Sequence, residues 1–224
     1  MNIKRSLGVV GLVGVVGLFV GAVSGRAEGV ALGAKVGTLG TGVEVTKWVW
    51  DCVNVRVGGN YLPVSFDWKQ NNIDYTADLT LASVVGLVDW HVFNNNFRVS
   101  GGALYNRNRV GLNATPTESK IIGDGAYSPQ EIGTLEGDIK FKPLAPYLGI
   151  GFGDAVEGSK RLSFSFDLGL MFQGAPDVDL SANGTMADNP IFLNDLEKEK
   201  TDWQDEANRF RFYPVLSFGM AYHF

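Results

Sequence analysis

Large apolar side chains alternate with small or polar ones over long stretches of this chain. The clearest stretch has its large apolar positions at Leu162, Phe164, Phe166, Leu168, Leu170 and Phe172. A period of two places successive side chains on opposite faces of a β-strand. This apolar face is too rich to be turned to water, whereas the opposite face carries mainly Ser, Asp and Gly. The pattern predicts a strand of a membrane barrel, with lipid outside and the lumen inside.

The last residues of the chain repeat this alternation. Their apolar face consists of Leu216, Phe218, Met220, Tyr222 and Phe224. Small or polar residues occupy the intervening positions, from Ser217 to His223. We therefore expect a final strand over 210–224 that also faces lipid.

The composition fits one barrel domain and excludes several other classes of protein. The chain has 224 residues, 29 of them Gly, with 12% aromatic residues and a mean hydropathy of +0.04. Alternating strands average to a neutral hydropathy, whereas a helical membrane protein would be far more apolar. The net charge of -5 offers no basic surface for nucleic acid. A single Cys, Cys52, allows no intrachain disulfide, and two His are too few for a usual zinc site.

The amino terminus has the composition of a secretory signal peptide. Lys4 and Arg5 precede an uncharged apolar run over 7–23, and small residues follow up to Ala27. This order predicts cleavage after Ala27. The alternative is a retained helix, but the apolar run is short for a membrane span. We expect a cleaved signal peptide over 1–27 and a barrel domain over 28–224.

Segments of period two recur along the rest of the chain and predict eight strands. They cover 29–37, 41–48, 52–66, 73–91, 97–113, 134–151, 160–174 and 210–224. The short connections, rich in Asp, Asn, Gly and Ser, fall on one side of the predicted barrel, at 48–51, 94–96 and 153–159. Short periplasmic turns and longer outer loops are typical of outer-membrane barrels. The very short connection at 38–40 leaves open whether 29–48 is one strand or two.

Several strands allow outward and inward positions to be assigned. In 52–66 the outward positions are Val53, Val55, Val57 and Tyr61. Segment 134–151 changes phase near Pro143, which predicts a β-bulge there. Segment 73–91 cannot be phased, because both of its faces are apolar near 84–88.

Together these features resemble the small eight-stranded outer-membrane β-barrels of Gram-negative bacteria, the OmpA/OmpX-type group. The terminal Ala221-Tyr222-His223-Phe224 carries part of the resemblance. It implies an all-β, up-and-down antiparallel barrel in the bacterial outer membrane, in contact with lipid and lipopolysaccharide. We expect a monomer. The resemblance also implies recognition by the barrel assembly machinery, through a signal formed by Phe218, Met220, Tyr222 and Phe224.

Charged residues at predicted lumen positions form a candidate network. They are Lys35, Glu44, Arg56, Asp78, Arg98, Asp167 and Arg211. Eight strands leave an interior just wide enough for side chains to fill. Buried charges in such a space must pair, because each unpaired ion carries a large desolvation penalty. We expect mutual salt bridges that fill the lumen, and the alternative is a narrow ion path lined by the same charges.

A lipid-modifying enzyme is a second class to weigh. Such an enzyme would need a Ser with a His and an acid near the outer leaflet. Both His91 and His223 fall at the predicted periplasmic ends of their strands, whereas Ser119 and Ser128 fall in an outer loop. We therefore expect no catalysis, no cofactor and no metal site. The glycines over 149–153 lack the following helix of a phosphate-binding loop.

One short amphipathic helix is predicted in the last long loop, over 191–210. Leu193, Leu196, Trp203 and Ala207 recur there at helical spacing among Glu and Lys. The helix could cover the barrel mouth, lie on the outer lipid surface or contact a partner. The sequence thus predicts a filled barrel with a structural or surface-interaction role. The alternatives are a small channel or transporter for ions or apolar solutes, and a lipid-modifying enzyme.

Overall fold

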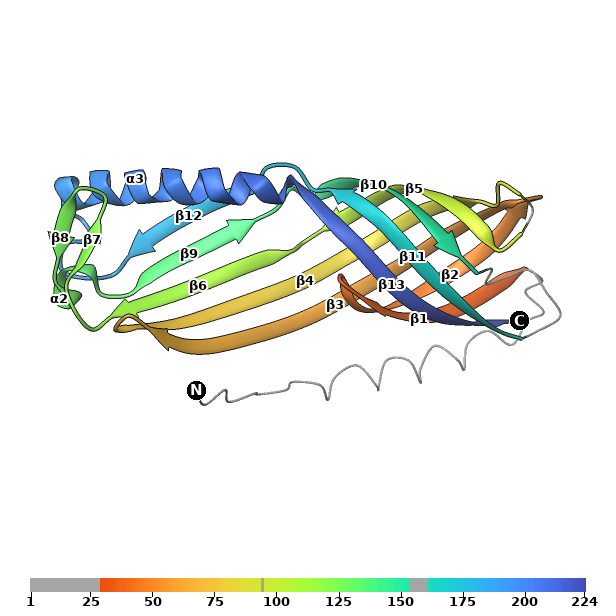
Figure 1. Cartoon of the computed structure of the whole chain (residues 1–224), viewed down its shortest axis with the longest axis horizontal. Helices are drawn as coiled ribbons and strands as arrows, with labels where there is room; N and C mark the ends of the chain where they lie inside the picture. Colours follow the sequence, from red (N-terminus) through yellow and green to blue (C-terminus); the bar gives the residue numbers. More distant parts are fainter. Residues whose placement is uncertain (1–28, 94, 154–160) are drawn as a thin grey trace.

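A computed structural model describes residues 29–93, 95–153 and 161–224. These residues form an elongated molecule whose strands run obliquely to its long axis (Figure 1). Two parts follow one another along that axis: a ring of strands that includes the C-terminus, and an open sheet that extends from the ring. The predicted signal peptide over 1–27 lies outside the described residues.

Eight strands close the ring. Each pairs antiparallel with the next, and the last pairs with the first. In their order around the ring they are β1 (Val30–Gly37), β2 (Gly40–Trp50), β3 (Val53–Gln70), β4 (Ile73–Trp90), β5 (Phe97–Asn106), β10 (Leu144–Phe152), β11 (Leu162–Phe172) and β13 (Phe212–His223). The prediction of an all-β, antiparallel fold is confirmed.

Beyond the ring, β3 and β4 continue as one long hairpin. There β4 pairs with β6, β6 with β9, and β9 with β12, which makes an open antiparallel sheet. The added strands are β6 (Arg109–Pro116), β9 (Leu135–Lys140) and β12 (Asp177–Ala182). We call this part the extension. A small two-stranded hairpin lies at the tip of the extension. The described residues thus contain thirteen strands, so the predicted number of eight fits the ring and not the whole fold.

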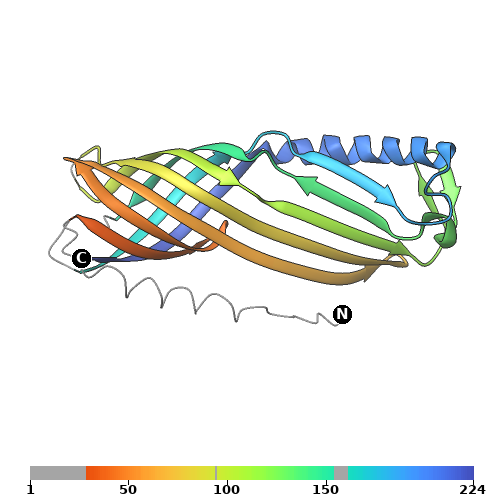
Figure 2. The same cartoon turned by 180° about the vertical axis from the view of Figure 1, so that it is seen from behind.

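The predicted helix over 191–210 is present as α3 (Pro190–Ala207), followed by the short turn η1 (Asn208–Arg211). Helix α3 lies along β12 on the extension and not over the ring (Figures 1 and 2). The ring of Trp203 occupies the space above Gly137 on β9, where a Cβ atom would lie 2.7 Å from it. None of the described helices is long and apolar enough to cross a membrane.

The tip of the extension is formed by three short elements. They are β7 (Lys120–Ile122), β8 (Gly125–Tyr127) and α2 (Pro129–Ile132). Side chains from all three pack against Phe192 and Leu196 of α3. The segment over 114–133, predicted as a loop, therefore closes one end of the extension with a small apolar core.

Two of the predicted strands are each divided in two. Segment 97–113 forms β5 and β6, and segment 134–151 forms β9 and β10. The division arises because β4 has two partners on the same edge. Its residues Ser83–Trp90 pair with β5, and its residues Ile73–Thr80 pair with β6. Strand β5 therefore belongs to the ring, whereas β6 belongs to the extension.

The predicted bulge at Pro143 is wrong, because Pro143 lies in the connection between β9 and β10. Leu135 of β9 packs in the apolar cluster on the inner side of the extension, whereas Leu148 of β10 is exposed on the outer side of the ring. Odd-numbered residues face inward on both strands. The apolar residues therefore lie on the inward face of β9 and on the outward face of β10.

Residues 29–48 form two strands, which answers the question that the sequence left open. Gly37 pairs with Gly40, so only two residues make the turn between β1 and β2. Gly40 has φ +99, a conformation that favours glycine. This tight hairpin ends β1 and β2 at the level where the extension begins.

The outer surface of the ring is apolar, as the alternation predicts. Phe164 and Phe218 are 70% and 57% exposed, whereas Asp167 and Ala221, at inward positions of the same two strands, are buried. Exposed aromatic side chains gather near the end of the ring opposite the extension: Trp48, Trp50, Trp90 and Phe93. The ring therefore has the apolar belt and aromatic girdle that are typical of a membrane barrel.

Candidate functional site

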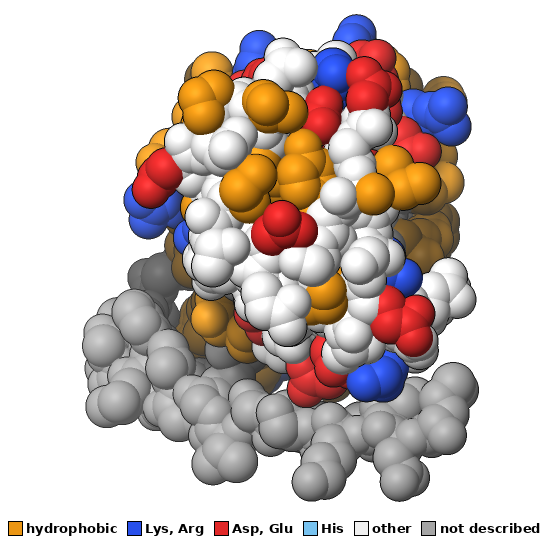
Figure 3. Space-filling model, turned by 90° about the vertical axis from the view of Figure 1, so that its left-hand side faces the viewer, with side chains coloured by type: hydrophobic (Ala, Val, Ile, Leu, Met, Phe, Trp, Pro, Cys, Tyr) orange, Lys and Arg blue, Asp and Glu red, His pale blue; other side chains and the backbone are white. Residues whose placement is uncertain are grey.

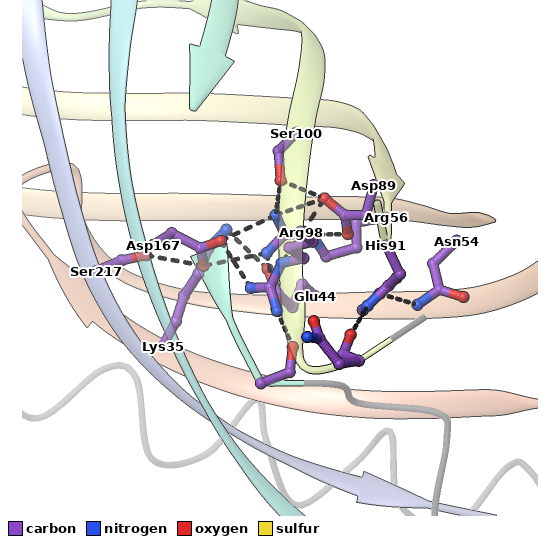
Figure 4. A network of polar contacts seen from close by, with 12 residues as sticks. Lys35, Glu44, Asn54, Arg56, Asp89, His91, Arg98, Ser100, Asp167 and Ser217 are labelled. Atoms are coloured by element: carbon purple, nitrogen blue, oxygen red, sulfur yellow. Dashed lines mark hydrogen bonds and ion pairs between the residues drawn. The ribbon is translucent and has the colours of Figure 1, made fainter. Parts of the chain in front are cut away.

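A network of charged side chains crosses the lumen of the ring (Figure 4). Arg56 on β3 lies at its centre. Arg56 Nε lies 2.6 Å from Asp89 Oδ2, and Arg56 Nη2 lies 3.2 Å from Asp167 Oδ1. Arg56 Nη1 lies 3.7 Å from Glu44 Oε1. One guanidinium group thus contacts three carboxylates that come from three other strands.

Two further cations complete the network. Arg98 Nη2 lies 2.6 Å from Asp167 Oδ1, and Lys35 Nζ donates a hydrogen bond to Glu44 Oε2 at 2.9 Å. The Ser100 hydroxyl donates to Asp89 Oδ1 at 2.5 Å. Three cations therefore face three carboxylates, and this lumen network has no formal net charge.

The strand register brings these side chains together, and a glycine makes room for them. Gly151 on β10 pairs with Arg98 on one side and Asp167 on the other. A Cβ atom on Gly151 would lie 2.7 Å from Asp167 Oδ1 and 2.8 Å from Arg98 Nε. The Arg98–Asp167 pair therefore passes over the backbone of β10, in space that a larger residue would fill.

Water reaches little of this network. Arg56 is 4% exposed and Asp89 is 1% exposed. Ions buried to this degree lose most of their hydration, so the structure needs each of them to have a partner. Removing one partner would leave an uncompensated charge inside the ring.

Most of the charged residues singled out from the sequence meet in the lumen network. Lys35, Glu44, Arg56, Arg98 and Asp167 belong to it. The structure does not bring Asp78 and Arg211 there: Asp78 lies on the extension and accepts a hydrogen bond from Ser65, and Arg211 is exposed in η1.

Sequence reasoning missed Asp89, because its strand could not be phased. The sequence does contain a signal for it. Asp89 lies at an odd-numbered position of β4, on the same face as Leu81, Val85 and Leu87. All four of these side chains are buried.

An apolar layer lies next to the lumen network, toward the extension. It consists of Leu39, Val85, Leu87, Leu104, Ala145, Tyr147, Met171 and Val215. Leu39 comes from the turn between β1 and β2 and folds into this cluster. The space left between the apolar layer and the charges is about 20 Å³, room for roughly one water molecule. The two layers together close the ring.

The residues weighed for an acyl-transfer or hydrolytic site lie far apart. His91 follows β4 at the end of the ring, where its Nε2 contacts Asn54 Nδ2 at 3.2 Å and its Nδ1 contacts Asn95 O at 2.8 Å. Ser128 lies at the opposite tip, where it contacts Glu131 at the start of α2. His223 ends β13, in the ring.

The predicted assembly-signal residues share the outer face of β13. Phe218, Met220 and Tyr222 are exposed there, and Phe224 packs edge-on against Tyr222 with ring centroids 5.2 Å apart. Their placement agrees with the alternation, but their recognition by an assembly machinery stays a prediction.

The extension has an apolar inner face and a charged outer face. Leu135, Leu180 and Ala182 pack on the inner face beneath α3. On the outer face, Arg109 Nε lies 2.5 Å from Asp138 Oδ1. Seen from the tip, apolar side chains lie among acidic and basic ones (Figure 3). Among the described residues, no three His, Cys, Asp or Glu side chains are grouped so that they could hold a metal ion.

Comparison with known proteins shows the fold. The chain resembles the crystal structure of Acinetobacter baumannii CarO2, with a TM-score of 0.60 and 21% identity over 87% of this chain and 98% of that chain. The crystal structure of Acinetobacter baumannii CarO matches with a TM-score of 0.57 and 19% identity, over 89% of this chain and 100% of that chain. No family model and no curated protein sequence matches the chain.

Proposed function

We propose that this chain is a bacterial outer-membrane β-barrel protein with a closed lumen and a structural or surface-interaction role, without catalysis. The apolar belt of the ring supports its placement in a membrane. The similarity of its fold to that of CarO2 and CarO agrees with a barrel. The role in surface interaction rests on the extension, which carries exposed apolar side chains such as Ile121 (76% exposed) and Ile191 (71% exposed).

One observation carries the closed lumen: a neutral network of buried ion pairs lies beneath an apolar layer, with space for about one water molecule between them. An ion that crossed the ring would have to break these pairs and then pass an apolar constriction. Both steps are costly, because neither layer offers water or a free counter-charge to the ion.

Electrical recording in planar bilayers tests the closed lumen. We expect no steady, selective current from the unmutated protein. Asp167→Ala should add little current, because the apolar layer remains in place. Asp78→Ala is the matched control, since Asp78 is a carboxylate outside the lumen network. Steady, ion-selective currents from the unmutated protein, altered by Asp167→Ala and not by Asp78→Ala, would favour a channel instead.

The inner face of the extension favours a second candidate, transfer of apolar solutes. Val64, Phe66 and Leu79 continue on the extension the face that lines the ring lumen. Phe66 is 53% exposed there, and Trp68 stacks on Tyr75 with ring centroids 4.9 Å apart. Uptake of an apolar fluorescent probe into proteoliposomes tests this candidate. Uptake above that of empty liposomes, and reduced by Phe66→Glu, would support it.

A lipid-modifying activity is tested directly by mass spectrometry of lipid A from cells with and without the protein. The proposed function expects identical lipid A species in the two strains. A difference in the acyl chains of lipid A between the two strains would show that the protein has a lipid-modifying activity.

A further inference from the structure

An apolar groove lies on the outer wall of the ring, at the end next to the extension. Its volume is about 390 Å³, within the roughly 300–1,000 Å³ typical of ligand sites. It crosses four neighbouring strands, and its lining includes Val43, Gly59, Tyr61, Ala82, Val84 and Tyr105. The large members of this lining are exposed, so the groove opens outward and not into the lumen.

The strand register explains the shape of the groove. Gly59 on β3 pairs with Val43 on one side and Val84 on the other, and Ala82 on β4 pairs with Tyr61. Two small residues thus form the floor between larger side chains. The nearest atom to a Cβ placed on Gly59 would be Ser83 O at 3.8 Å, so the space above Gly59 is open.

One cationic side chain borders the groove at its extension end. The guanidinium carbon of Arg107 lies 5.8 Å from the centroid of the Tyr105 ring. Across the described residues no carboxylate pairs with Arg107, whereas Arg109, two residues further on, is bound by Asp138. Arg107 therefore offers an exposed charge and a planar donor group to an anion from outside the protein.

We propose that this groove binds one acyl chain of lipid A, with a phosphate of the same lipid on Arg107. The groove lies within the apolar belt, so its occupant comes from the surrounding membrane; this step rests on the proposed membrane placement. The exposed guanidinium of Arg107 lies at the end of the belt next to the extension, which we place outside the cell. In an outer membrane that leaflet carries phosphorylated glycolipid, and guanidinium groups bind phosphate through paired hydrogen bonds.

Native mass spectrometry of the full chain in detergent, titrated with purified lipid A, tests the head-group contact. We expect the unmutated protein to retain one lipid A molecule. Arg107→Ala should weaken retention about tenfold, the loss expected for one charge-assisted contact. Arg109→Ala, which removes an equal charge already held by Asp138, should leave retention unchanged.

A second pair of variants tests the groove itself. Gly59→Leu should fill it and reduce retention. Gly101→Leu is the matched control, because a Cβ on Gly101 meets nothing within 4 Å, so its space is at least as open as that above Gly59, and Gly101 does not line the groove. Dephosphorylated lipid A should bind the unmutated protein as weakly as intact lipid A binds Arg107→Ala.

Equal retention by Arg107→Ala and Arg109→Ala would overturn the proposal, as would equal retention by the two leucine variants. Phosphatidylglycerol that competes as well as lipid A would also overturn it. If Gly59→Leu does not fold, the comparison of the two arginine variants decides, since both side chains are exposed. Currents through the unmutated ring would refute the closed lumen but would leave these comparisons unaffected.

Discussion

Asp89 is the most deeply buried carboxylate of the lumen network. It faces Arg56 at 2.6 Å and accepts a hydrogen bond from Ser100. Asp89→Asn removes the charge and keeps the volume, so that Arg56 loses part of its compensation. Breaking a buried pair costs roughly 3–5 kcal/mol, and less where water enters.

We therefore expect a lower midpoint of unfolding in urea for Asp89→Asn. The matched change Asp78→Asn, on the extension, should shift the midpoint far less, because Asp78 is exposed. Equal shifts for the two variants would mean that the lumen charges do not act as a buried network.

Asp195 makes a second residue-scale prediction, at the tip of the extension. Hydrogen bonds from Lys198 and Tyr127 hold the pKa of Asp195 below its usual range. A carboxyl group with a lowered pKa stabilises the fold above its ordinary pKa, and that stability is lost as the pH falls through the lowered value. We expect the tip to loosen in acid, seen as a loss of near-ultraviolet circular dichroism from aromatic side chains.

In Asp195→Asn this acid-dependent loss should be weaker, because the titrating group is gone. Asp202→Asn, an exposed carboxylate on the same helix, serves as the control and should keep the behaviour of the unmutated protein. An unchanged acid profile in Asp195→Asn would contradict the assignment.

At the scale of elements, β3 and β4 each pass through two environments. In the ring their outward positions are apolar, as at Val57 and Val84, and β4 also places Val85 and Leu87 in the lumen. On the extension Phe66 and Leu79 lie on the inward face of the same strands. The strands keep their alternation, but their outward face is apolar in the ring and mainly polar on the extension, where the apolar side chains lie on the inward face.

This difference in environment predicts unequal costs for the same substitution in the two parts of the molecule. Phe166→Arg, near the middle of β11, should cost about 2–4 kcal/mol if it lies at the bilayer midplane. Phe66→Arg, on the extension, should cost about 1 kcal/mol or less, since it meets water. Unfolding in urea from lipid vesicles measures both, and equal costs would mean that Phe166 does not contact lipid.

The same difference in environment explains what the sequence could and could not predict. Period two located all eight ring strands, because alternation does not depend on which face is buried. It could not separate β5 from β6 or β9 from β10, since each pair reads as one continuous strand. We assumed that the apolar face of every strand contacts lipid. The change of apolar face near Pro143 was therefore interpreted as a β-bulge, whereas it marks the passage from the extension to the ring.

Pairing across the lumen was also partly beyond the sequence. Arg56, Arg98 and Asp167 were found because their strands have a clear outward face. Asp89 was not, because Val84 and Val85 make both faces of β4 apolar around it. Only the register of neighbouring strands shows which face of β4 is inside.

For the whole molecule, membrane placement is the prediction on which the proposed function depends most. The mature protein should start near Glu28 and remain with the membrane fraction after carbonate washing. Folded barrels resist detergent, so unboiled and boiled samples should migrate differently on gels. A protein that carbonate releases from membranes, with no such shift, would contradict the outer-membrane assignment.

The hairpin of β3 and β4 sets a distance as well as a shape. Each strand has 18 residues, paired without interruption from Val53–Trp90 to Gln70–Ile73. At about 3.4 Å per residue the hairpin is roughly 60 Å long. About half of it, from Leu62 to Gln70, lies beyond the hairpin of β1 and β2. Because the register is uninterrupted, the ladder of backbone hydrogen bonds continues from the ring into the extension and carries the tip away from the ring. A partner that binds the tip would meet it beyond the end of the ring by up to about 30 Å, the length of these residues measured along the strands, so strand length sets that distance.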